Sequence, residues 1–136
     1  MAIANCALEP ANADVIISQQ VAPALCVFFC VRALMGMQGA ISGLMIALSV
    51  ANASQYAAGA LAHLSHHSMH NQELIGKEPG IMHRIASLLG GGDAGALHYC
   101  VLALANLGCA TANQEKMAAT PGLVAQVSQV LLWKCI

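Results

Sequence analysis

The sequence predicts an all-α fold built from repeated groups of short helices. Tyr56 and Tyr99 lie 43 residues apart, and each is followed four residues later by the pattern Ala-Leu-Ala-x-Leu. The triplet Asn-Gln-Glu at residues 71–73 recurs at residues 113–115 after 42 residues, so one connecting loop is a residue shorter in the second copy. A period in the low forties is typical of arrays of paired or tripled helices.

The composition is the third observation that favours this fold. The chain is 58% hydrophobic and 8% charged, whereas about a quarter of an average soluble domain is charged. Its 136 residues suffice for one domain with a core, and most apolar side chains must be buried against neighbours or in lipid. The net charge is −1 and the basic residues are scattered. Because nucleic-acid binding needs a basic patch, it is not expected here.

Breaking and capping residues divide the repeated region into short helices. Gly90-Gly91-Gly92 is the clearest break, and Asp93 is the expected N-cap of a longer helix that ends at Gly108. Asn71 and Asn113 are expected to cap the short helices that they begin. The other predicted helices are a helix capped by Asn52 or Ser54 that ends near Leu64, and helices at residues 71–77, 80–89, 113–119 and 122 to about 133.

This order of elements resembles an armadillo repeat, in which two short helices precede a longer third one. The residues that carry the resemblance are Asn71, Gly80-Ile81, Ile85 to Leu89, the break at Gly90 to Asp93, and Cys100 to Leu107. The resemblance covers most of the chain and implies an α-α superhelix, a right-handed armadillo-like solenoid of about two and two-thirds repeats. Residues 1–136 would form one domain, divided into the end of a repeat (1–10), a repeat with an insertion (11–68), a repeat (69–110) and a truncated repeat (111–136). The chain is therefore expected to be part of a longer array.

The apolar region near residues 31–49 interrupts the pattern. It is expected to form an elongated second helix, followed by an additional helix that packs back on the array. A competing hypothesis is a membrane-embedded helical hairpin at residues 21–50, because the spacing Gly39-x-x-x-Gly43 lets membrane helices approach closely. Arg32 and the glycines divide the region into stretches shorter than the eighteen or so apolar residues of a usual span, so this hypothesis is the weaker one.

The resemblance also implies where a partner would bind. In armadillo proteins the third helices line a concave groove that holds an extended peptide, often through a Trp and an Asn one helical turn apart. In this chain the asparagine position holds Asn5, His63 and Asn106, the tryptophan position holds Met1, Gly59 and Leu102, and Gln55 and His98 lie one turn earlier. The predicted groove residues are Gln55, Gly59, His63, His98, Leu102 and Asn106.

The departures from the family's pattern limit the choice of partner. The groove lacks tryptophan and acidic neighbours, so a basic peptide of the nuclear-import kind is not the expected ligand. The expected function is a non-catalytic scaffold that binds a protein or peptide segment, with self-association through the exposed solenoid ends as a further expectation. For Asn106 a structural role, a hydrogen bond to the next repeat, is the competing interpretation.

Catalysis has little support in the sequence. The acidic residues fall mostly at predicted helix starts and loops, where they complement the helix dipole. His98 and Cys100 are two residues apart and so do not face each other on a helix. We therefore predict no catalytic residue and no cofactor. None of the six cysteines forms a CxxC pair and the chain lacks a secretory start, which favours the cytosol, with the nucleus as the alternative compartment.

A cluster of four histidines, His63, His66, His67 and His70, supports a further alternative. The pairs 63/67 and 66/70 have the spacing of one helical face, and imidazoles so placed can bind Zn²⁺ or another transition metal. The cluster spans the predicted end of a helix, however, and no carboxylate or cysteine lies nearby in sequence. A solvated loop is the favoured interpretation, so no metal site is predicted.

Overall fold

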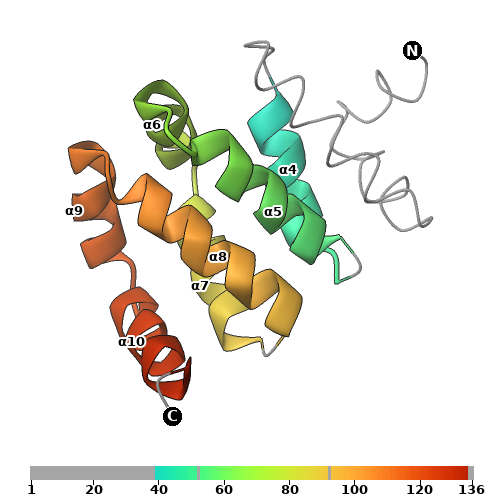
Figure 1. Cartoon of the computed structure of the whole chain (residues 1–136). Helices are drawn as coiled ribbons and strands as arrows, with labels where there is room; N and C mark the ends of the chain where they lie inside the picture. Colours follow the sequence, from blue (N-terminus) through green and yellow to red (C-terminus); the bar gives the residue numbers. More distant parts are fainter. Residues whose placement is uncertain (1–38, 52, 92, 135–136) are drawn as a thin grey trace.

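The computed structural model describes residues 39–51, 53–91 and 93–134, and every regular element in these ranges is an α-helix (Figure 1). The helices are α4 (Ala40–Leu48), α5 (Ser54–Ser65), α6 (Met69–Lys77), α7 (Ile81–Gly90), α8 (Ala94–Leu107), α9 (Thr111–Ala119) and α10 (Leu123–Lys134). The predicted all-α fold is confirmed. The predictions for residues 1–38, which include the repeat end at 1–10 and most of the hairpin at 21–50, lie outside the described residues.

None of the seven described helices is both long enough and apolar enough to cross a membrane.

The helix starts confirm one predicted cap and correct three others. Asp93 caps α8, because its Oδ1 accepts a hydrogen bond from the N–H of Gly95 at 3.0 Å. Ser54 is the first residue of α5 and its hydroxyl donates to the carbonyl of Ala51, so it is not the predicted N-cap. Asn71 and Asn113 are not N-caps either, because α6 and α9 each begin two residues before the asparagine.

Side-chain amides near the start of α6 and α9 instead bind the end of the preceding long helix. Because the last carbonyls of a helix have no partner within it, an amide N–H of the next helix satisfies them. These hydrogen bonds, of 2.8–3.0 Å, run from Asn71 to the carbonyl of Leu64, from Gln72 to Ser65, from Asn113 to Leu107 and from Gln114 to Gly108. The donors recur after 42 residues and the acceptors after 43, so the missing loop residue lies between α8 and α9.

Each of the helices α4 to α7 lies against the helix three places further along the chain. The pairs are α4 with α7, α5 with α8, α6 with α9, and α7 with α10. Figure 1 shows α5 and α8 side by side, and these two helices share the longest contact. Small residues at Ala58, Gly59 and Ala62 on α5 let the two helices approach closely.

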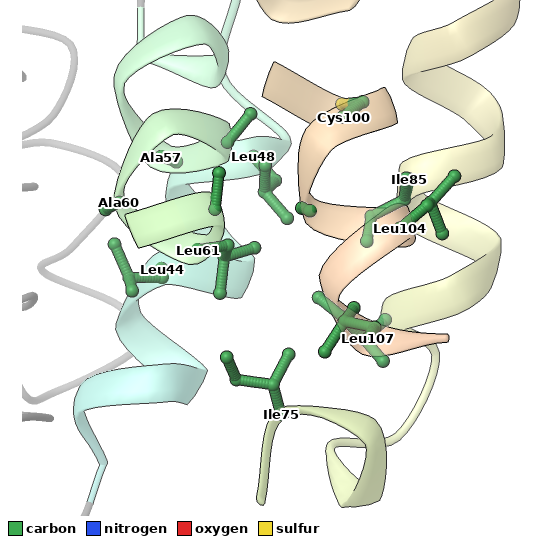
Figure 2. Packing of buried hydrophobic residues seen from close by; sticks show 14 of the residues in the cluster. Leu44, Leu48, Ala57, Ala60, Leu61, Ile75, Ile85, Cys100, Leu104 and Leu107 are labelled. Carbon is green, nitrogen blue, oxygen red and sulfur yellow. The ribbon is translucent and has the colours of Figure 1, made fainter. Parts of the chain in front are cut away.

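The core is one continuous cluster between these helices (Figure 2). Leu44, Leu61, Ile85 and Leu107 come from four different helices, and each side chain is at most 1% exposed. Complete burial of such a side chain contributes about 1.5–3 kcal/mol relative to its exposure. The fold is therefore stabilised mainly by contacts between helices that are distant in sequence.

The structure describes residues 39–49 of the region 31–49, and these residues include α4. Gly39 precedes α4 with φ 81°, as Gly80 (φ 77°) precedes α7 and Gly122 (φ 78°) precedes α10. Helix α4 contacts α5 and α7, as α7 contacts α8 and α10. Because this left-handed position favours glycine, Gly39 belongs to the turn that leads into a helix. The part of the predicted insertion at residues 31–38 lies outside the described residues.

Candidate partner-binding surface

The structure brings most of the predicted groove residues to the outer side of α5 and α8. On α5, Gln55 and His63 are exposed, and on α8, His98 is exposed and Leu102 is 39% exposed. Tyr56 lies on the same pair of helices and is 45% exposed. We call the patch formed by Gln55, Tyr56, His63, His98, Tyr99 and Leu102 the α5–α8 surface.

Tyr99 fills the space between the two helices, a role that the sequence analysis did not predict. A Cβ at Gly59 would lie 3.6 Å from the Tyr99 ring, so the ring covers the glycine and Gly59 itself is buried. The ring centroid of Tyr99 lies 5.2 Å from that of His98 in an edge-on arrangement and 6.4 Å from that of His63. The sequence did contain a signal for this contact, because Gly59 stands at the position where the next copy has Leu102.

Asn106 holds α5 and α8 together. Its Nδ2 donates to the carbonyl oxygen of Ala62 at 3.0 Å and to Oγ of Ser65 at 3.3 Å. Both acceptors lie on α5, which precedes α8 in the chain, whereas the structural interpretation expected a hydrogen bond to the next repeat. The amide N–H groups of Asn106 therefore bind within the protein. The neighbouring groove residues Gln55, His63, His98 and Leu102 are exposed instead.

The histidines do not form the paired arrangement that their spacing suggested. Helix α5 ends at Ser65 and α6 begins at Met69, so the pairs 63/67 and 66/70 do not share a helical face. His67 has φ 53°, and its ring lies 3.9 Å from that of His66, measured between centroids. Within residues 39–51, 53–91 and 93–134, no three His, Cys, Asp or Glu side chains are grouped so that they could hold a metal ion.

A shallow hollow of about 390 Å³ lies between the α6–α7 turn and the α9–α10 turn. Its lining includes Lys77, His83 and Lys116. Lys116 Nζ donates to the carbonyl oxygen of Gly76 at 2.6 Å, so this ammonium group links α9 to α6. This hollow could not be predicted from the sequence, because it depends on the packing of two turns that are distant along the chain.

Cys100 is a buried residue of α8. Burial raises the pKa of its thiol from 9.0 to about 12, and the nearby carboxylate of Asp93 shifts this pKa in the same direction. The thiolate is the nucleophilic form of cysteine, so the buried Cys100 thiol is a poor nucleophile at neutral pH. Cys109, in contrast, is a free and exposed thiol.

This difference predicts selective alkylation. We expect iodoacetamide at about pH 8 to modify Cys109 readily and to leave Cys100 unmodified until the chain is unfolded. Peptide mapping by mass spectrometry, with and without denaturant, measures both sites. Because the unfolded thiol loses its proton above pH 9.0 while the folded thiol keeps it, a rise in pH from 9.0 towards 12 also lowers the stability of the fold. Equal alkylation rates at the two cysteines in the native protein would contradict the buried position.

The described structure thus belongs to the all-α class, with an uncharged, partly aromatic surface on two adjacent helices. Comparisons of the chain with protein-family models, with curated proteins and with solved structures found no match.

Proposed function

We propose that the chain is an armadillo-like α-solenoid that acts as a non-catalytic scaffold and binds a segment of another protein on the α5–α8 surface. Support for the solenoid comes from the packing of each helix on the helix three places further along, and from the amide-to-carbonyl hydrogen bonds that recur after 42 or 43 residues. Such stacking, in which each unit contacts only its neighbours, is typical of solenoids.

The observation that carries the binding role is the chemistry of the α5–α8 surface. Exposed Tyr56 and Leu102 provide apolar area on the same two helices that carry the imidazoles of His63 and His98 and the amide of Gln55, and Asn106 fixes these helices relative to each other. Tyrosine is enriched at protein interfaces because it combines a large apolar ring with a hydrogen-bonding group. The surface residues carry no acidic or basic charge besides the histidines, so binding would depend little on salt.

The proposal also includes the cellular compartment of the protein. The free, exposed thiol of Cys109 suits a reducing environment, and we place the scaffold in the cytosol.

The test begins with a displayed library of random 12-residue peptides, selected on the wild-type chain. The affinity of the enriched peptides is then measured for the double variant Gln55→Ala/His98→Ala and for a control, His83→Ala/Ser87→Ala, whose exposed residues lie on α7. We expect the first variant to lose affinity by about tenfold or more, which corresponds to about 1.4 kcal/mol, and the control to keep it.

Two outcomes would contradict the proposal. The first is that no peptide is enriched on the wild-type chain above a blank surface. The second is that the α7 control loses as much affinity as the α5–α8 variant, which would place binding elsewhere on the molecule.

A further inference from the structure

The α5–α8 surface lies on two helices that carry no charged side chain apart from histidine. Neither α5 nor α8 contains Asp, Glu, Lys or Arg, whereas α6, α7, α9 and α10 each contain at least one of these residues. A charged group of a ligand would lose its hydration on such a surface without gaining a partner of opposite charge. Charge complementarity therefore favours a ligand segment without charged side chains.

Helices α5 and α8 place equivalent side chains at the same height along the pair. Asn106 of α8 donates to the carbonyl oxygen of Ala62, one residue from its own equivalent position in the first copy. The Tyr99 ring lies over Gly59, one turn from its equivalent, Tyr56. The two helices therefore run in the same direction with their copies of the pattern side by side (Figure 1).

This arrangement sets the distance between Tyr56 and Tyr99. The axes of packed helices lie about 8–10 Å apart, so equivalent residues of α5 and α8 are separated by about this distance. A polyproline II helix rises about 3.1 Å per residue, so residues three apart along it are separated by about 9 Å. Tyr56 is 45% exposed and Tyr99 is half-buried, so both rings keep accessible area. Each tyrosine can therefore contact one of two prolines that are three residues apart.

The polar groups of the surface suit the backbone of such a segment. Proline has no N–H group, and the carbonyl groups of a polyproline II helix form no hydrogen bonds within it. A proline-rich ligand therefore needs hydrogen-bond donors. Gln55, His63 and His98 carry side-chain N–H donors, and all three are exposed on the same two helices. Aromatic side chains line the surfaces on which polyproline segments dock in other recognition domains.

We propose that the α5–α8 surface binds a proline-rich segment of another protein in the polyproline II conformation, with prolines three residues apart on Tyr56 and Tyr99. This inference rests on the proposed scaffold function and specifies the ligand of the same surface. A copy of this chain does not supply the ligand, because no two of its four prolines are three residues apart. A polyproline II segment is extended and stiff before it binds, so it loses little conformational entropy on the surface.

Synthetic peptides that differ only in the spacing of their prolines test the proposal. The probe is a 12-residue peptide with proline at every third position and uncharged alanine and serine elsewhere. The comparison peptide has the same composition, but its prolines are two or four residues apart and never three. We expect the full chain to bind the probe about tenfold more tightly than the comparison peptide, as measured by fluorescence anisotropy.

Variants of the chain assign the preference to the tyrosines. Tyr56→Ala leaves one ring, so the affinity for the probe is expected to fall about tenfold, to the level of the comparison peptide. Tyr56→Phe keeps the ring and should keep the preference. Leu74→Ala on α6, which also removes an exposed apolar side chain, is the matched control and should leave binding unchanged. Thermal melting followed by circular dichroism verifies that each variant is folded.

Three results would overturn the inference: no saturable binding of the probe, equal affinity of the wild-type chain for both peptides, or a preference that persists in Tyr56→Ala. Selection from the random peptide library separates this inference from the scaffold function. If the enriched peptides depend on Gln55 and His98 but lack prolines three residues apart, the surface binds a ligand of another chemistry and only this inference fails. If no peptide is enriched, both proposals fail.

Discussion

Replacement of Gly76 with alanine is expected to destabilise the fold by about 3 kcal/mol, at the upper end of the range for overpacked cores. A Cβ at this position of α6 would overlap Oδ1 of Asn113 and lie 2.5 Å from its Cγ. Asn113 is 1% exposed and its amide is bonded to the carbonyls of Gln72 and Leu107, so it has no free space to move into. Urea denaturation followed by circular dichroism measures the loss.

Gly95→Ala is the matched control for this experiment. Gly95 also lies in a helix, and a Cβ there would meet a side chain, that of Gln55, at 2.6 Å. Gln55 is exposed and can rotate away, so we expect a change within about 0.5 kcal/mol or a small gain from the better helix propensity of alanine. Equal destabilisation by the two substitutions would contradict the rigid α6–α9 contact.

Replacement of Asn113 with alanine is expected to cost about 3 kcal/mol. The amide donates at 2.8 Å to Gln72 of α6 and at 3.0 Å to Leu107 of α8, so it joins three helices. Its loss removes the donor from both carbonyls and leaves a cavity in a buried place. The control is Gln114→Ala, which removes one bond of an exposed side chain to Gly108 and should cost less than about 1 kcal/mol.

The two substitutions are also expected to be coupled. In Asn113→Ala the atoms that clash with a Cβ at position 76 are absent, so adding Gly76→Ala should cost little more. The double variant should therefore be more stable than the sum of the two single losses predicts, by about 2 kcal/mol, within the range known for residues in contact. If the losses of stability were additive, the destabilisation by Gly76→Ala would not arise from its contact with Asn113. The same urea denaturation measures the wild type, the two single variants and the double variant.

Helix boundaries that local chemistry decides were predictable from the sequence. The glycine break before Asp93 and the cap at Asp93 predicted the start of α8, and the predicted ends of α6 and α9 agree with the observed ones. The prediction for Asn71 and Asn113 was wrong, because an asparagine near a helix start can serve its own N-terminus or the preceding C-terminus. Only the tertiary structure shows which unpaired backbone group the asparagine side chain can reach.

The candidate surface, too, was predictable from the sequence only in part. Spacing along α5 and α8 placed Gln55, His63, His98 and Leu102 on helices that carry the same pattern, and the structure brings these helices together. Tyr99 was missed as a surface residue because its role depends on Gly59 in another helix. The spacing of the four histidines was misleading, since α5 ends within the cluster.

By itself, the sequence of this protein determined the helical class, the 42–43-residue recurrence and most helix ends, because these depend on glycines, caps and apolar spacing within a few residues of each other. The tertiary structure alone decided that α4 packs on α5 and α7, that Asn106 and Asn113 link neighbouring helices, and that the ring of Tyr99 lies over Gly59. The physical reason is that burial and hydrogen bonding between helices some 40 residues apart depend on which surfaces meet, and spacing along one helix does not specify its neighbour.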